Sequence, residues 1–583
     1  MTATTQNKHC LLTEALDQFI GNPYQADNPF SYARLAELDR LEDFPFEACR
    51  ALNDFGLNKY YVPTCYGGLM TSYEELMQLW RIVARRDLTL VVAHGITVLG
   101  AASVWVAGLP EQAKQLGVEI AQGSIVSWGL TERHHGSDLL AGELSATSVA
   151  DDWCINGEKW LINNATHGQM ICVLARTSPE GGARGFSLFL VDKRQIPSLT
   201  YDCLPKERTH GIRAADISGI VFQEAVVPSS RLVGRPGEGI ETVLKALQLT
   251  RTLSVALSQG AADHALQLTV DFAKQHKLYD RHLIDLPPAC RTIGEAVTAL
   301  LVAEAVCTVA SRSIHALTAE MSVISAITKS FVPTIVDEMI FKLSELLGAR
   351  AFLTEEYAQG MFQKLERDHR IVGIFDGSTI VNRNALINQF RTLARAYYSK
   401  RCDQNGLVEA VTFTHPLTEF SPKRLSLLSN TGCSVVQSIP NAIIQVWDLV
   451  RSGTVSASVG YLAEKFRIKA EAVIAEMSVY EPSARDVPAT AFTLAMRYEL
   501  CFAGTACLQL WLCNQRWAST KPVQSVWQDA LWLEASLVFI LNRLCFGEEL
   551  TDAAVYDRLT NKVIIKQPQA PLSLLLDSGA GSR

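Results

Sequence analysis

The sequence predicts an α+β protein that is mainly helical and folds as several domains. The chain has 583 residues, more than one compact core usually accommodates. Apolar residues make up 48% and charged residues 19%, so large cores can be buried. Helical periodicity dominates both ends of the chain, and short strand-like runs lie between them. We expect an N-terminal helical domain (1–125), a central β-barrel-like domain (126–235), a second helical bundle (236–400) and an appended C-terminal helical domain (401–583).

The first domain is expected to be helical because its apolar residues recur at helical spacing. The predicted helices are Arg34–Asp54, Ser72–Arg86 and Glu111–Gln122. Between the last two, Leu88–Leu109 contains no Asp, Glu, Lys or Arg and is long enough to cross a bilayer. However, His94, Gly95 and other polar or small residues dilute its hydrophobicity and favour two shorter helices buried in a bundle. We therefore expect no membrane span.

The central domain is expected to be a sheet because short β-rich runs alternate with turn clusters such as Ser178–Gly182. The predicted strands are Gln169–Ala175, Gly185–Val191 and Gly219–Phe222.

Helical periodicity resumes at Glu238 and continues almost to the end of the chain. Lys400–Gly406 is expected to be a linker between the second bundle and the appended domain, and the tail after Gln567 is expected to fray. The predicted helices are Ile240–Lys277, Ala289–Leu317, Ser322–Leu347, Arg383–Tyr398, Ser434–Leu449, Ala457–Met477, Ala489–Leu512 and Gln524–Leu544.

Charge and cysteine content exclude some classes of function. With 53 Lys plus Arg against 60 Asp plus Glu, the net charge of −7 gives no overall attraction to nucleic acid or anionic lipid. The 14 cysteines include no CxxC pair, and no His/Cys spacing fits a metal ion, so we expect reduced thiols and no metal. Residues 1–9 lack an apolar signal segment. We expect a cytoplasmic protein.

The most informative stretch is Gly129–Ala141, with the sequence GLTERHHGSDLLA. It resembles the flavin-binding signature of the acyl-CoA dehydrogenase family in the spacing from Thr131-Glu132 to the run Gly136–Asp138. His135 departs from this pattern, since the family has a small residue or Asn there. Backbone amides and a Thr hydroxyl in such a loop can hydrogen-bond the polar edge of an isoalloxazine ring.

Further matches follow in family order over roughly residues 40–398. They are similar to the family's N-terminal turn, the strand that faces the flavin, the segment leaving the sheet domain and the stretch with the catalytic base. The matching segments are Val62–Gly68, Asn156–Asn164, Val221–Gly239, and Arg367-Asp368 followed by Ile374–Thr379.

The resemblance implies FAD-dependent α,β-dehydrogenation of an acyl thioester. In this reaction a carboxylate removes the proton from Cα, and flavin N5 takes the hydride from Cβ. By position the base is Asp376, where the family usually has Glu, so the side chain is shorter by about 1.5 Å. A shift of that size can cost about a hundredfold in rate. The alternative is that Asp376 caps a helix or turn. The family's other base position holds Thr250, which cannot serve.

The resemblance also implies the contacts of the cofactor and the substrate. Leu161 replaces a usual aromatic residue, and Asn163 replaces Thr or Ser but can still donate a hydrogen bond to the flavin. His276 replaces an Arg that reaches the cofactor's pyrophosphate, and Glu345 replaces a Gln. The implied FAD contacts are Trp128, Leu130, Thr131, Gly136, Ser137, Leu161, Asn163, His276, Tyr279, Glu345, Gly348, Ser378 and Thr379. The implied substrate contacts are Ser137, Arg251, Phe375 and Gly377, although Arg251 fits a surface ion pair equally well.

Three hypotheses follow from this resemblance. The first is an acyl-thioester dehydrogenase whose substrate is carried by CoA or by an acyl carrier protein, and whose electrons pass to a flavoprotein. The second is a flavin oxidase or monooxygenase that uses oxygen. The third is a binding protein that keeps the fold without turnover, which the altered base and flavin contacts allow. A homodimer is expected, because extra C-terminal helices in relatives cover the surface that shorter members use to form tetramers.

Overall fold

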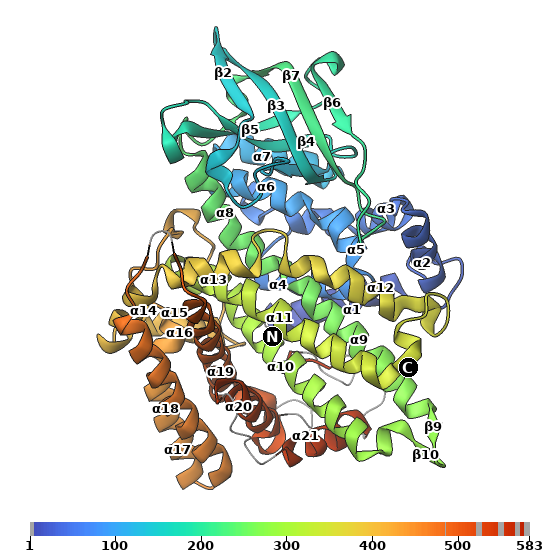
Figure 1. Cartoon of the computed structure of the whole chain (residues 1–583), viewed down its shortest axis with the longest axis vertical. Helices are drawn as coiled ribbons and strands as arrows, with labels where there is room; N and C mark the ends of the chain where they lie inside the picture. The colour runs from blue at the N-terminus through green and yellow to red at the C-terminus, as the bar shows by residue number, and fades with distance from the viewer. Residues whose placement is uncertain (1–4, 484–485, 520–526, 546–552, 566–571, 576–583) are drawn as a thin grey trace. The chain divides into compact units, whose positions relative to one another are not determined.

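The computed structural model describes residues 5–483, 486–519, 527–545, 553–565 and 572–575. The described chain forms two compact units. The sheet unit comprises Leu16–Leu253 and Ser421–Leu427, and the helical unit comprises the described residues within 5–15, 254–420 and 428–575. The predicted class is confirmed, since helices predominate and one mixed sheet occupies the middle of the chain (Figure 1). The boundaries between the four predicted domains stay a prediction.

Helices open the sheet unit. In α4, Ser72 caps the first turn by accepting a hydrogen bond from the Glu75 backbone N–H at 3.1 Å. The predicted helix Arg34–Asp54 is wrong as one element, because Glu42 adopts a left-handed φ of 60° and Pro45 precedes the second helix. The helices are α2 (Tyr32–Leu41), α3 (Phe46–Phe55), α4 (Tyr73–Arg86), α5 (Leu88–Leu90), α6 (Thr97–Ala107) and α7 (Pro110–Ala121).

The apolar stretch Leu88–Leu109 is broken, as its composition predicts. A π-helical turn at Val91–Gly95 follows α5, and the chain bends by 44° before α6. By length and composition this bent pair, and also Pro287–Ala316 and Thr318–Ala351, pass as candidate membrane spans among the described residues. The apolar windows of the last two are 94% and 83% buried inside the structure. Their surfaces are thus covered largely by protein.

One mixed sheet of eight strands follows these helices in the sheet unit (Figure 1). The pairing order is β6-β7-β3-β2-β4-β5-β8, and β1 pairs with β4 in parallel. Ile155, Val173, Phe189 and Phe222 are buried in its core. The predicted strands correspond to β4, β5 and part of β7. The bounds are β1 (Val126–Gly129), β2 (Ser145–Val149), β3 (Asp152–Asn163), β4 (Met170–Arg176), β5 (Phe186–Asp192), β6 (Tyr201–Leu204), β7 (Ile217–Pro228) and β8 (Leu232–Val233).

The helical unit is built around two long helices, α10 and α11, which pack against each other and against α9. The predicted helix Ile240–Lys277 is wrong as one element, since the chain breaks at Val255 without a glycine or proline to mark the position. The division between the units falls within α1 (Thr5–Ile20) and α8. All of α8 (Gly239–Ser254) except its last residue belongs to the sheet unit. The elements of the helical unit up to residue 400 are α9 (Ala256–Gln275), β9 (Lys277–Leu278), β10 (Arg281–His282), α10 (Pro287–Ala316), α11 (Met321–Leu347), α12 (Met361–His369), α13 (Thr379–Ile387) and α14 (Phe390–Tyr398).

The chain after residue 400 adds further helices to the same unit. The expected linker Lys400–Gly406 is only partly a linker, because α15 begins at Gln404 with Asp403 as its cap. The buried Arg312 of α10 donates hydrogen bonds to four backbone carbonyl groups between Glu409 and His415. The start of the predicted helix Gln524–Leu544 and most of the tail lie outside the described residues. The helices are α15 (Gln404–Val411), α16 (Ser434–Gln437), α17 (Ile439–Arg451), α18 (Ala457–Val479), α19 (Ala489–Ser519), α20 (Leu531–Leu544) and α21 (Ala554–Leu559).

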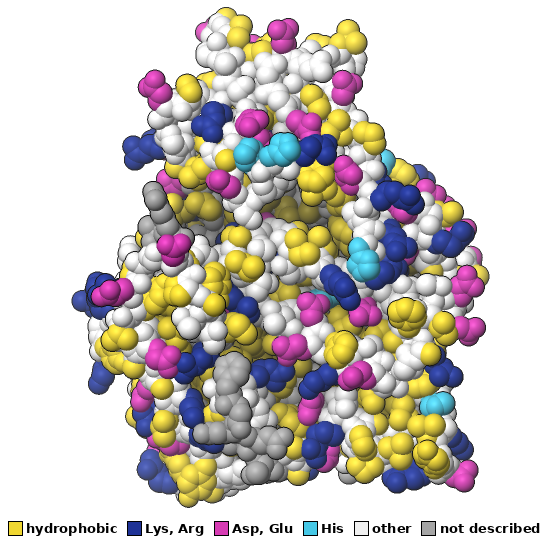
Figure 2. All heavy atoms as spheres, in the orientation of Figure 1, with side chains coloured by type: hydrophobic (Ala, Val, Ile, Leu, Met, Phe, Trp, Pro, Cys, Tyr) yellow, Lys and Arg dark blue, Asp and Glu magenta, His cyan; other side chains and the backbone are white. Residues whose placement is uncertain are grey.

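Most of the described cysteines pack into the structure, and none of those from Cys49 to Cys545 forms a disulfide. Burial raises the pKa of Cys172 and of Cys501 to about 12, which keeps these thiols protonated at neutral pH. Acidic and basic side chains are interspersed on the face that Figure 2 shows.

A buried carboxylate joins the appended helices to the bundle and predicts a pH dependence of stability. Glu320, between α10 and α11, accepts hydrogen bonds from the backbone N–H and the hydroxyl of Ser434, both at 2.7 Å. Burial raises its pKa from 4.5 to about 7, although the Ser434 hydrogen bonds oppose this shift. Because the folded-state pKa is raised, the contribution of Glu320 to stability is fully present below pH 4.5 and is lost as pH rises through 7.

The Glu320→Gln variant should therefore lose a pH-dependent contribution on the order of 3 kcal/mol between these limits. We expect its urea-unfolding midpoint to fall less steeply with pH than that of the wild type. Glu476→Gln is the control, because the Glu476 side chain is 52% exposed in its ion pair with Arg497. An unchanged slope in Glu320→Gln would contradict this account.

Candidate functional site

The flavin-signature loop is held against strand β3 of the sheet unit. The Thr131 hydroxyl donates to the Trp160 carbonyl oxygen at 2.8 Å, and the Trp160 N–H donates to the Thr131 carbonyl oxygen at 3.0 Å. The Glu132 carboxylate accepts the backbone N–H groups of Glu143 at 2.6 Å and Leu144 at 3.1 Å. The Glu132 side chain therefore joins the start of the loop to the residues that follow its end.

Lys159 completes this anchor and is a residue whose role the sequence reasoning missed. Its ammonium lies 2.7 Å from Glu132 and donates to the Leu130 carbonyl oxygen at 3.1 Å. Both side chains are buried. Burial alone would raise the pKa of Glu132, but Lys159 and the two backbone N–H groups hold it below its usual value. Burial lowers the pKa of Lys159, and Glu132 opposes that shift.

The predicted flavin-facing side chains offer polar atoms that the described chain leaves unused. Trp128 on β1 is 8% exposed, and its indole N–H has no hydrogen-bond partner among the described residues. Asn163 at the end of β3 donates from Nδ2 to the Val92 carbonyl oxygen at 2.8 Å, which fixes the orientation of its amide. Its Oδ1 is buried and makes no hydrogen bond within the described chain. These orphaned groups fit a planar ligand with a polar edge.

A bulge in β3 sets the position of Leu161. The pairing with β7 shifts between Trp160 and Ile162, and Leu161 adopts φ 57° with its side chain 45% exposed. Trp160 does not replace the missing aromatic residue, because its indole N–H donates to Glu207 at 2.8 Å and Arg133 lies 4.7 Å from its ring. The correspondence of Leu161 to the family's aromatic position stays a prediction.

The rest of the signature loop is open. Gly136 and Ser137 are exposed, and a Cβ added to Gly136 would meet nothing within 4 Å. Leu130, at the start of the loop, is half-buried. Arg251, a predicted substrate contact, is half-buried on α8 of the same unit. The space over Gly136 is available to a ligand.

The proposed base lies in a tight turn of the helical unit. Asp376 has φ 57° and Gly377 has φ 93°, so two left-handed residues follow Phe375. Asp376 is half-buried, and its Oδ2 atom is shielded from solvent. Asp376 is not a helix cap, because Ser378 caps α13 by accepting a hydrogen bond from Val381 N–H. A role for Asp376 as a turn cap stays an alternative.

The remaining predicted cofactor contacts of this unit fall into two sets. Ser378 and Thr379 follow the base, and the Thr379 hydroxyl donates to the Gly373 carbonyl oxygen at 3.4 Å. His276 and Tyr279 lie at the β9–β10 hairpin, whereas Glu345 and Gly348 lie near the end of α11.

The structure brings the hairpin and the end of α11 together through aromatic contacts. The His276 ring stacks on the Phe272 ring with 4.7 Å between their centres. The Arg350 guanidinium lies 5.0 Å from the centre of the same Phe272 ring. Arg350 is thus a second basic group near His276. Sequence reasoning missed it, because its residue type alone did not distinguish it from other surface arginines.

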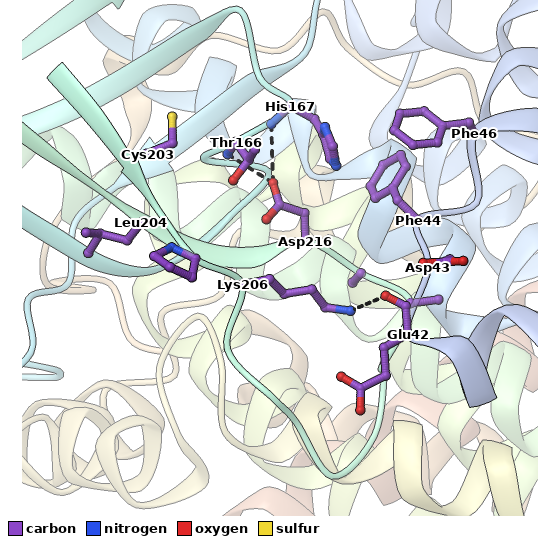
Figure 3. A pocket seen from close by; sticks show the side chains of 13 residues that line it. Glu42, Asp43, Phe44, Phe46, Thr166, His167, Cys203, Leu204, Lys206 and Asp216 are labelled. Atoms are coloured by element: carbon purple, nitrogen blue, oxygen red, sulfur yellow. Dashed lines mark hydrogen bonds between the residues drawn. The ribbon is translucent and has the colours of Figure 1, made fainter. Parts of the chain in front are cut away.

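The sheet unit also contains a pocket of about 450 Å³ (Figure 3). Phe44, Phe46 and His167 form an aromatic cluster at its edge. Two of its charged side chains are engaged in hydrogen bonds to the backbone. Lys206 donates to the Glu42 carbonyl oxygen at 2.6 Å, and Asp216 accepts from the Thr166 N–H at 3.0 Å. None of the predicted cofactor or substrate contacts lines this pocket.

No group of three or more His, Cys, Asp or Glu side chains in the described part of the chain is arranged to hold a metal ion.

Comparisons with known protein families agree with the order of the segments. Residues 30–124, 127–225 and 237–390 match the N-terminal, middle and C-terminal domain models of acyl-CoA dehydrogenases. A probable acyl-CoA dehydrogenase, fadE25 of Mycobacterium leprae, is 28% identical over 60% of this chain and 88% of its own length. Cyclohex-1-ene-1-carbonyl-CoA dehydrogenase of Syntrophus aciditrophicus is 25% identical over 60% of this chain and 83% of its length.

Solved structures share the fold. Glutaryl-CoA dehydrogenase in complex with glutaryl-CoA gives a TM-score of 0.60 at 21% identity, covering 67% of this chain and 96% of that one. An acyl-CoA dehydrogenase of Bacillus anthracis complexed with FAD gives 0.68 at 17% identity, covering 98% and 93%. The appended helices are therefore part of a fold seen elsewhere. A prolyl acyl carrier protein oxidase, AnaB, gives 0.59 at 18% identity, covering 65% and 98%.

The fold and these matches define an oxidoreductase that acts on CH–CH bonds and uses FAD. The chain belongs to the acyl-CoA dehydrogenase family.

Proposed function

We propose that this protein catalyses α,β-dehydrogenation of an acyl thioester with Asp376 as the base. The observation that carries the proposal is the placement of this carboxylate. It stands in a turn of two left-handed residues, with one oxygen shielded from solvent, directly before the capped helix α13. A carboxylate withdrawn from water is suited to removing a weakly acidic proton.

The chain's own residues have distinct tasks in this mechanism. Asp376 takes the proton from Cα, and Phe375, Gly377, Ser137 and Arg251 are the proposed substrate contacts. Hydrogen bonds to the thioester oxygen stabilise the charge that develops as the proton leaves. When bound, FAD supplies the acceptor for the Cβ hydride at N5. The Trp128 indole N–H as a donor and Asn163 Oδ1 as an acceptor, which the described chain leaves unused, would hold the polar edge of the ring.

The nucleotide end of FAD is proposed to meet the second set of cofactor contacts. Arg350 provides positive charge for the pyrophosphate, His276 beside it offers a ring N–H, and Glu345 and Gly348 lie near the end of α11. In the same region the side chains of Tyr279 and Phe352 are 92% and 86% exposed. We propose that a second copy of the chain covers them in a homodimer.

The acyl carrier and the electron acceptor are narrower parts of the proposal. The family supports an acyl-CoA substrate and an electron-accepting flavoprotein. The likeness in fold to a prolyl acyl carrier protein oxidase supports a carrier-bound substrate and electron transfer to oxygen as the alternative. The free thiols fit a reducing compartment, and a cytoplasmic location is proposed with them.

Anaerobic flavin reduction tests the proposed function. The FAD-loaded protein should lose its yellow colour when mixed without oxygen with the matching saturated thioester, supplied on CoA or on an acyl carrier protein. Readmission of air should yield little peroxide if a flavoprotein is the acceptor, and stoichiometric peroxide if oxygen is. A protein that binds FAD but is bleached by no member of either panel would instead be a binding protein.

A further inference from the structure

The turn that contains Asp376 is supported on both sides by side chains of the helical unit. Before the turn, the fully buried Lys329 of α11 donates a hydrogen bond to the Val372 carbonyl oxygen, and its ammonium lies 4.8 Å from the centre of the Phe375 ring. After the turn, the Asn382 amide of α13 donates to the Gly377 carbonyl oxygen at 2.8 Å. The backbone on either side of Asp376 is thus fixed by α11 and α13.

The residues that follow Lys329 and Asn382 in the sequence bind one carboxylate, that of Glu499 on α19. Its Oε1 accepts the Ser330 hydroxyl at 2.7 Å, and Ser330 follows Lys329 on α11. The same carboxylate binds Arg383, which follows Asn382 on α13, through Nε at 2.9 Å and Nη2 at 3.1 Å. Glu499 is 2% exposed. One buried side chain therefore joins the two helices that flank the base.

The chemistry of this contact makes it rigid. An Arg–carboxylate pair with two parallel hydrogen bonds has a fixed orientation, and burial excludes the water that would compete for it. Burial raises the pKa of Glu499, and Arg383 and Ser330 oppose that shift. Helix α19 packs against both α13 and α11 (Figure 1). It also lies beyond residue 390, where the match to the family models ends.

From this arrangement we infer that Glu499 is a positioning residue for Asp376, and that the appended domain takes part in catalysis through it. The inference rests on the proposed function. Without the carboxylate, Arg383 loses its buried partner, and α13 keeps its direct packing on α11 but loses the hydrogen-bonded bridge to Ser330. The turn between them can then shift, and a displacement near 1 Å is enough to slow the chemical step by up to about a hundredfold.

Glu499→Gln tests this role against Glu304→Gln as the matched control. Glu304 is also a fully buried carboxylate that joins α10 to a late segment, because it accepts hydrogen bonds from the Ser573 hydroxyl and the Leu574 N–H, neither of which belongs to α13. With a thioester that bleaches the wild type, Glu499→Gln should lower the limiting rate of flavin reduction at least tenfold. The substrate Kd and the FAD content should change less than twofold. Glu304→Gln should keep the wild-type limiting rate.

A wild-type limiting rate in Glu499→Gln would overturn the inference, as would equal losses in both variants. If Glu499→Gln does not fold, Arg383→Lys is measured instead, because lysine keeps the charge but cannot make both hydrogen bonds. It should show the same split between limiting rate and Kd.

Hydrogen exchange separates this inference from the proposed function. Backbone amides of residues 370–378 should exchange faster in Glu499→Gln than in Glu304→Gln, whether or not a thioester reduces the flavin. Equal exchange in the two variants would overturn the positioning role. A wild type that no thioester bleaches would contradict the proposed function and leave the exchange result to decide the structural link.

Discussion

Asp376→Asn should abolish flavin reduction by acyl thioesters while leaving FAD bound. The amide cannot accept the Cα proton, and loss of a general base typically costs about a thousandfold in rate. The fold should persist, because asparagine, like aspartate, tolerates the left-handed conformation that Asp376 adopts at φ 57°. The measurement is the rate of anaerobic bleaching at saturating thioester, with the flavin-to-protein ratio determined on the same sample.

Asp376→Glu provides the control for this prediction. Glutamate keeps a carboxylate and restores the side-chain length usual in the family, so measurable reduction should survive within about a hundredfold of the wild-type rate. If asparagine supports reduction at the wild-type rate, Asp376 is not the base.

Glu132→Gln should weaken FAD binding more than any neighbouring substitution. Lys159 would keep its charge in a buried position without a counterion, and at least one of the backbone N–H groups of Glu143 and Leu144 would lose its acceptor. Breaking a buried ion pair from one side costs about 3 kcal/mol, which corresponds to roughly a hundredfold if it is expressed in FAD affinity. Titration of the apoprotein with FAD measures this effect directly.

Glu158→Gln is the matched control for Glu132→Gln. Glu158 precedes Lys159 on the same strand, but its ion pair with Arg133 has a nitrogen–oxygen distance of 3.2 Å, and the two side chains are 37% and 47% exposed. Such pairs contribute less than about 1 kcal/mol. Equal FAD affinity in the two variants would mean that the Glu132–Lys159 pair does not hold the loop.

Much of the fold could be predicted because its signals are local. The strands of the central sheet follow from short apolar runs between turns, and His94 and Gly95 mark the break in the apolar stretch. The break at Val255 left no such signal, since neither glycine nor proline stands there. Two helices were therefore expected as one.

The candidate site was predictable as a set of positions but not as a set of contacts. Motif spacing singled out Thr131, Asn163 and Asp376. The ion pair of Glu132 and Lys159 joins residues 27 positions apart, and a lysine in a strand is ordinarily expected at the surface. The bond between Glu499 and Arg383 joins residues 116 positions apart. Such contacts depend on tertiary packing, which residue spacing does not encode.

The same limit applies to backbone conformation. The bulge that exposes Leu161 arises from the register of β3 against β7, and Trp160 donates its indole N–H to Glu207 in the segment between β6 and β7. The sequence showed only that the aromatic residue stands one position early.

The most direct test of the central claim is to identify the product of a single anaerobic turnover. One equivalent of a saturated acyl thioester, mixed with the FAD-loaded protein, should yield a thioester lighter by two hydrogen atoms in proportion to the flavin that is reduced. The wild type should form this α,β-unsaturated product and Asp376→Asn should not. An unchanged thioester, or loss of hydrogens at the wild-type rate in Asp376→Asn, would contradict the account.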